Sequence, residues 1–185
     1  MKGISLIIRI LLPLSLALFV WAGFMNYSNS LSGHHLTKWD PLLYACLLCI
    51  YTIFWTVSNL DKSKETVLGR IGRKEYRAEH ALRLAAFFFG GVIIFGVNSE
   101  EPLFWVVTVK HLHLIFTATA IVFGYTFILW LPSTWQYRKF WRWVLLGFGG
   151  ITFFLGFAFD LYSVTWSEFF VALPITFAIY KFIEK

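Results

Sequence analysis

The sequence predicts an all-α fold, a polytopic integral membrane protein built as one six-helix transmembrane bundle. The first observation is composition: the 185 residues are 58% hydrophobic and 21% aromatic, and 14% are charged, whereas charged residues make up about 25% of a soluble domain. The second observation is that the apolar runs are continuous, without the alternation of a membrane β-strand. Because every backbone amide inside hydrocarbon must be bonded within the chain, these runs are predicted to be helices.

Six runs approach the roughly 20 residues that a helix needs to cross a bilayer. The first has a basic start, like a signal peptide, but it is longer than a signal core and no small-residue cleavage pattern follows it, so a true span is predicted. The fourth could begin at residue 102, but a helix from there to residue 131 would have 30 residues, so residues 102–108 are interpreted as an interfacial lead-in. The predicted spans of this single domain, residues 1–185, are 4–25, 41–59, 80–97, 109–131, 140–160 and 167–182.

Glycine and proline positions add detail to these spans. Glycine lets neighbouring helices approach closely, so close packing is predicted at Gly90 and Gly91 of the third span. The same is predicted for the fifth span, which contains Gly147, Gly149 and Gly150. Pro13 and Pro174 predict kinks in the first and sixth spans.

The distribution of Lys and Arg predicts the orientation, because short cytoplasmic loops retain positive charge. With six spans, fourteen basic residues fall on one side and only Lys38 and Lys110 on the other. Both termini are therefore predicted to be cytoplasmic, in what we interpret as a bacterial inner membrane. The net charge of +6 then reflects topology and affinity for anionic headgroups. Membrane lipids, and another membrane protein as an alternative, are the expected partners; nucleic acid is not implied.

The largest cytoplasmic segment runs from Asp61 to Glu79 and mixes basic residues with Val67, Leu68 and Ile71. A solvated loop with a short interfacial helix is the simpler interpretation. Contact with lipid headgroups or with a partner is the alternative.

The outer side of the predicted bundle collects four of the five histidines, together with acidic residues that include Asp160 and Glu168. Histidine and carboxylate ligands suit zinc or a similar ion, which needs three or four of them. However, His111 and His113 are two residues apart on a helix and point about 200° apart. A passive rim, a polar site without metal and a metal site all stay open. The candidate metal ligands are His34, His35, His111 and His113.

Among these residues, His113 is the main candidate for a catalytic or binding role, because it lies deepest toward the hydrocarbon, where an ionisable group is costly. We expect His113 to turn inward and to find an acidic or hydroxyl partner from the fifth or sixth span, with Glu168 and Asp160 as candidates. Lys110 and His111 should instead reach the outer aqueous boundary. A single heme cannot join His113 to His80, because the two are predicted at opposite ends of their spans. Pairing of His113 with the loop residue His35 is a heme alternative without further support.

The two cysteines form a C-x-x-C motif, Cys46 and Cys49, near the outer end of the second span. With the following Ile-Tyr, this string resembles the redox-active segment of the DsbB quinone reductases. In that family an Arg follows the second cysteine by four residues, whereas Ile53 stands here, and the chain has no second cysteine pair. Cysteines among apolar neighbours are unreactive, so buried small hydrophobes are the favoured interpretation.

A broader resemblance covers approximately residues 81–181. His113 opens a span followed by LIFTATAIVF, and Trp166-Ser167-Glu168 opens a last span that ends at Lys181. This arrangement is similar to the six-span FRAG/DRAM/Sfk-type membrane proteins and to small bacterial proteins related to them. The resemblance implies a six-span fold and His113 with Glu168 as a candidate pair. It also implies a link to lipid or lipid-anchor handling.

Two functional hypotheses follow. In the first, the protein is a non-enzymatic membrane protein that binds lipid or a partner through its aromatic helices. In the second, it is a membrane enzyme acting on a lipid headgroup at the outer face, with His113 as general base and Glu168 or Asp160 orienting it. A thiol/quinone redox or heme-binding subunit is a third alternative. The sequence names no cofactor.

Overall fold

The computed structural model describes residues 2–24, 41–95, 102–104, 107–129, 138–157 and 164–184. Within them lie seven helices: α1 (Lys2–Phe24), α3 (Pro41–Ser58), α4 (Asp61–Glu65), α5 (Ala78–Ile94), α6 (Val109–Leu129), α7 (Arg138–Phe157) and α8 (Val164–Glu184). Two antiparallel hairpins are also present, β1 (Val67–Ile71) with β2 (Lys74–Arg77), and β3 (Pro102–Phe104) with β4 (Val107–Thr108). The prediction of an α-helical bundle is confirmed, and the hairpins are additions to it.

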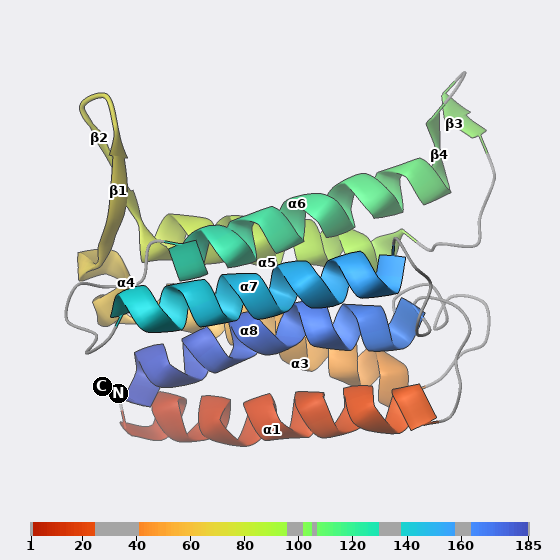
Figure 1. Ribbon diagram of the computed structural model, residues 1–185, viewed down its shortest axis with the longest axis horizontal. Helices are drawn as coiled ribbons and strands as arrows, with labels where there is room; N and C mark the ends of the chain where they lie inside the picture. The colour runs from red at the N-terminus through yellow and green to blue at the C-terminus, as the bar shows by residue number, and fades with distance from the viewer. Residues whose placement is uncertain are drawn as a thin grey trace.

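The six long helices lie side by side in one bundle, with the two chain ends at the same end as α4 and the β1–β2 hairpin (Figure 1). The β3–β4 hairpin lies at the opposite end (Figure 1). Helix α1 packs against α3 and α8, α3 packs against α5, and α5 packs against α6. Helix α7 packs mainly against α8 and also touches α6.

Each predicted span corresponds to one of the long helices. The first and last residues of each span differ from those of its helix by at most three positions. Pro13 and Pro174 lie inside α1 and α8. The predicted lead-in, residues 102–108, contains the strands of the β3–β4 hairpin. Among the residues described, one helical stretch, His111–Leu129, is both long and apolar enough to cross a membrane; Leu6–Leu18 and Leu47–Ser58 are shorter apolar helical stretches.

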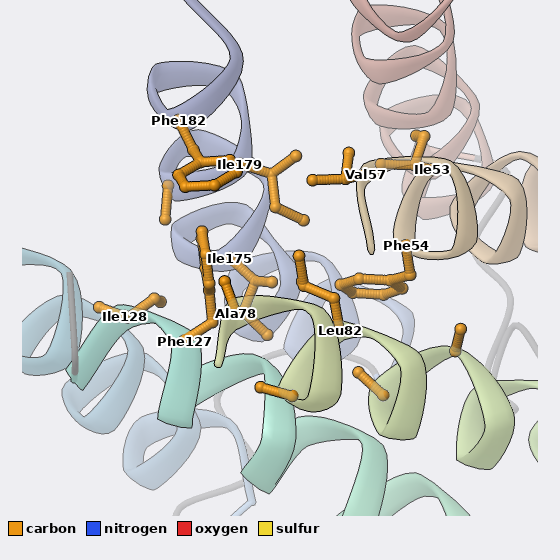
Figure 2. Packing of buried hydrophobic residues seen from close by; sticks show 14 of the residues in the cluster. Ile53, Phe54, Val57, Ala78, Leu82, Phe127, Ile128, Ile175, Ile179 and Phe182 are labelled. Carbon is orange, nitrogen blue, oxygen red and sulfur yellow. The ribbon is translucent and has the colours of Figure 1, made fainter. Parts of the chain in front are cut away.

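The hydrophobic core fills the half of the bundle that is nearer the chain ends. Figure 2 shows side chains of α3, α5, α6 and α8 meeting there. Alanines line the core side of α5, at positions 78, 81, 85 and 86, and their small size lets α5 lie deep among its neighbours. The largest fully buried core side chains are Phe127, Phe182, Ile8, Leu82, Ile128, Ile179 and Val57.

Helices α5 and α6 are in close contact at Gly91. A methyl group at this position would overlap the ring of Phe116. Phe116 in turn stacks on Phe95 with ring centroids 5.5 Å apart and is tilted against Phe88 at 5.7 Å. The close packing predicted for glycine is confirmed here. It is also confirmed at Gly149, where a methyl group would overlap the Tyr125 hydroxyl. The prediction is wrong for Gly147 and Gly150, where an added methyl group would meet no described atom within 4 Å, and Gly90 makes only an ordinary contact.

We predict that Gly91→Ala destabilises the fold by about 1–3 kcal/mol, because the methyl group overpacks the contact with Phe116. Gly90→Ala is the matched control. The nearest atom to its added methyl group is Cε2 of Tyr51 at 3.5 Å, an ordinary contact, and alanine is the better helix former. Denaturant unfolding of the purified protein in detergent, followed by circular dichroism, should separate the two variants. Equal stability of both would contradict the tight α5–α6 contact.

Candidate functional site

A cavity of about 100 Å³ lies beside the core and is lined by residues of α1, α3, α5, α6 and α8. Phe54 and Ile175 belong to both the core and the cavity wall, so the cavity continues the core along the bundle. Most of the wall is aliphatic or aromatic. The polar side chains among its described residues are Ser15, Thr117, Glu168 and Thr176.

The hydroxyl of Thr117 differs from the other helical hydroxyls. Thr119 and Thr126, on the same helix, each donate to the carbonyl four residues earlier at 2.7 Å, and Thr176 does so at 2.9 Å. Thr117 Oγ1 is buried and has no hydrogen-bond partner among the described atoms. Since a buried hydroxyl without a partner is costly, Thr117 offers a donor and an acceptor to a molecule in the cavity.

Glu168 enters the cavity from the second turn of α8 and is half-buried. Negative charge is favoured near a helix N-terminus, because the unpaired amide groups there carry partial positive charge. The sequence predicted Glu168 as a site residue, and the structure places it in the wall of the described cavity. Glu168 is the one acidic side chain in the described lining of the cavity.

His113 faces inward, as predicted, and is 2% exposed. Its Nδ1 lies 2.5 Å from the carbonyl oxygen of Phe95, and because a carbonyl can only accept, Nδ1 carries the proton and donates. Phe95 is the C-terminal cap of α5, where backbone carbonyls lack partners within the helix. The bond shown therefore joins α6 to the end of α5, the third predicted span, rather than to an acid or hydroxyl of the fifth or sixth. His113 is not among the described residues that line the cavity.

His111 is exposed and caps the start of its own helix. Its Nδ1 accepts from the backbone N–H of Thr108 at 3.2 Å, and the Thr108 hydroxyl accepts from the His111 N–H at 3.3 Å. His80 has the matching position in α5, where its Nδ1 accepts from the Arg77 N–H at 3.3 Å. This reciprocal cap was missed in the sequence, although Thr-x-x-His before an apolar run resembles a capping box. The predicted divergence of His111 and His113 is confirmed.

Several sequence-predicted positions lie outside the described residues, namely His34, His35 and Asp160. The side chain of Lys110 is also not described. Within the described part of the chain, no group of three or more His, Cys, Asp or Glu side chains could hold a metal ion. His80 and His113 lie at opposite ends of the antiparallel α5–α6 pair, in agreement with the argument against one heme between them.

The C-x-x-C motif lies within α3. Cys49 is a free, half-buried thiol; the side chain of Cys46 is outside the described set. The redox alternative stays a prediction.

Comparison with family models found no match, and neither a curated protein nor a solved structure is significantly similar to the chain. The resemblance of residues 81–181 to FRAG/DRAM/Sfk-type proteins therefore stays a prediction. The cavity residues that sequence reasoning missed are the hydroxyls, Thr117 above all. Thr117 could have been recognised from the sequence, because it lies one helical turn after His113 on the same face of α6.

We predict that His113→Phe lowers the free energy of unfolding by about 1–3 kcal/mol, because it leaves the Phe95 carbonyl buried without its donor. His113→Asn keeps an N–H donor and should recover part of the loss. Thermal unfolding in detergent measures both variants. A His113→Phe protein as stable as the parent would show that the bond to Phe95 contributes nothing to the fold.

Proposed function

We propose that the chain is a non-enzymatic integral membrane protein that crosses the membrane six times and binds the hydrocarbon part of a membrane lipid in the cavity between α1, α3, α5, α6 and α8. The observation that carries the lipid assignment is the cavity itself. It has mostly apolar walls and is lined by one acidic side chain, Glu168. It is also lined by the Thr117 hydroxyl, which has no hydrogen-bond partner among the described atoms. Small-molecule sites have this composition, with few polar groups fixing the orientation of the ligand.

Exposed apolar side chains support the membrane assignment. Large hydrophobic residues face outward on all six long helices, and 28% of the stretch His111–Leu129 is buried. Large apolar side chains exposed on every long helix are typical of a surface that contacts a membrane or another protein. On α7 alone the exposed large side chains are Phe140, Trp143, Val144, Phe148, Ile151, Phe153 and Phe154.

Helix length and charge support the same assignment. The six long helices have 17 to 23 residues, which corresponds to about 26–35 Å and suits a hydrocarbon core of about 30 Å. Their middle sections contain no Lys, Arg, Asp or Glu. Arg9, Arg83 and Arg142 each lie in the first turns at the end of the bundle that carries the chain ends. This basic end corresponds to the proposed cytoplasmic side of an inner membrane.

The size of the cavity indicates which part of a lipid it can bind. A cavity of about 100 Å³ is smaller than the roughly 150 Å³ that accommodates benzene. It therefore suits a segment of an acyl or isoprenoid chain, with a hydroxyl or carbonyl oxygen of the ligand near Thr117. A whole headgroup would be too large and too polar for these walls.

The arrangement of His113 favours a binding role over catalysis. A general base must lie within hydrogen-bond reach of the reacting group and near the residue that orients it. The described cavity that contains Glu168 does not include His113 in its wall, so this cavity does not bring His113 and Glu168 together. The resemblance to six-span proteins linked to lipid handling agrees with a lipid ligand.

The six-span topology makes a direct prediction. Reporter fusions after Lys185 and within residues 33–38 should lie in opposite compartments, the first in the cytoplasm, because an even number of spans returns the chain to its starting side. Alkaline phosphatase and green fluorescent protein activities measure the two positions. The same compartment for both fusions would contradict six spans.

Filling the cavity should remove the lipid. Ala120 is buried in the cavity wall, whereas Ala118, two residues earlier, is exposed. Ala120→Leu should lower labelling of α6 by a lipid with a diazirine in its acyl chain by about tenfold, which requires a loss of only about 1.4 kcal/mol of binding energy. Ala118→Leu should label like the parent. Equal labelling in both variants would place the lipid elsewhere on the helices.

A further inference from the structure

The β1–β2 hairpin is fixed to the bundle at its base. Leu68 of β1 is 3% exposed and belongs to the hydrophobic core. Arg77 Nη1 donates to the carbonyl of Lys64 at 2.9 Å, and the Ala78 N–H donates to the carbonyl of Thr66 at 3.0 Å. From this base the hairpin projects sideways, across the direction of the helices (Figure 1). These contacts fix the direction of the hairpin relative to the bundle.

The tip of the hairpin combines positive charge with an exposed apolar side chain. Residues 67–77 have a net charge of +3. Gly72, with φ of 62°, begins the two-residue turn and provides the positive φ that such turns require. Ile71 and Lys74 are paired across the strands and therefore share one face. The side chain of Ile71 is 75% exposed.

The single acidic residue of the hairpin is occupied by internal contacts. Glu75 binds Arg70 at 2.9 Å and Arg77 at 3.4 Å. The hydrogen bond from Arg70, with the contribution of Arg77, holds the pKa of Glu75 below its usual range. Within the described residues, Arg73 and Lys74 form no ion pair and no side-chain hydrogen bond, so their charges are available to an external anion.

We infer that the tip, residues 70–74, binds the anionic lipid headgroups of the membrane surface, with Ile71 entering the headgroup layer and Arg73 and Lys74 contacting phosphate groups. This inference rests on the proposed function, because the sideways projection runs along the membrane surface when the helices cross the membrane. The hairpin leaves the bundle at its basic end, where the helices that contain Arg83 and Arg142 begin. Positive charge beside an exposed aliphatic side chain matches an anionic membrane interface.

The test uses hydrogen–deuterium exchange of the full chain in nanodiscs. One set contains phosphatidylcholine alone, and the other contains phosphatidylcholine with phosphatidylglycerol. Amides of residues 70–74 should exchange at least about fivefold more slowly in the anionic nanodiscs, the factor expected for one well-placed cation. The double variant Arg73→Gln/Lys74→Gln should lose this difference. The double variant Lys64→Gln/Lys139→Gln, which removes the same charge from exposed positions outside the hairpin, should retain it.

Three results would overturn the inference. Equal exchange of the tip in both lipid compositions would exclude anionic lipid as its ligand, and so would slowing that persists in Arg73→Gln/Lys74→Gln. Slowing that appears only after a cytosolic protein fraction is added would assign the tip to a protein partner. In each case lipid labelling of α6 reports on the proposed function separately. If α6 keeps the lipid labelling that Ala120→Leu lowers, the proposed function stands and only the inference about the hairpin fails.

Discussion

The contact between Gly91 of α5 and the ring of Phe116 of α6 is the constraint on which the rest of the bundle depends. It sets the separation of two helices that supply much of the cavity wall. His113 lies one turn before Phe116, and Phe95 lies one turn after Gly91. The close approach at the glycine therefore brings the imidazole to the carbonyl that ends α5. Because glycine has no side chain, Gly91 explains the spacing of α5 and α6, the burial of His113 and the capping of the C-terminal end of α5.

The helices of this fold were predictable, because long apolar runs without charge leave few alternatives for a backbone that must bond to itself. The β1–β2 hairpin was not predicted. Residues 61–79 were interpreted by their charge, which suggested a solvated loop with a short interfacial helix at no stated position. The structure has a short helix, α4, at the start of this segment and strand β1 at Val67–Ile71. The register of the hairpin depends on Leu68 packing into the core, a tertiary contact that no local pattern encodes. Its one local signal is Gly72 between short alternating segments.

The site was predicted in part. The burial of His113 followed from its depth along the span, and Glu168 was recognised as an acid at the start of the last span. The bond to the Phe95 carbonyl could not be anticipated, because it depends on the residue at which α5 ends.

The cavity could not be anticipated either. It brings together residues as distant in the chain as Ser15 and Thr176, and apolar runs do not reveal which helices become neighbours. His111 was expected at the rim, and its exposure agrees, but its capping role is a property of local hydrogen bonding that composition does not reveal.

The uneven filling of the bundle along its length has a mechanical consequence. The large core cluster joins all six long helices near the chain ends, whereas the second cluster of described residues has only Leu47 and Ile93 as buried members. At the end of the bundle away from the chain ends, α5 and α6 stay joined through Gly91 with Phe116 and through the bond from His113 to Phe95. Local opening requires less free energy where fewer apolar contacts must separate, so α1, α3 and α8 can move apart at that end while the large core cluster stays packed. A molecule can then enter the cavity through the end of the bundle that opens. The opposite end of the same helices, near the chain ends, keeps the protein folded.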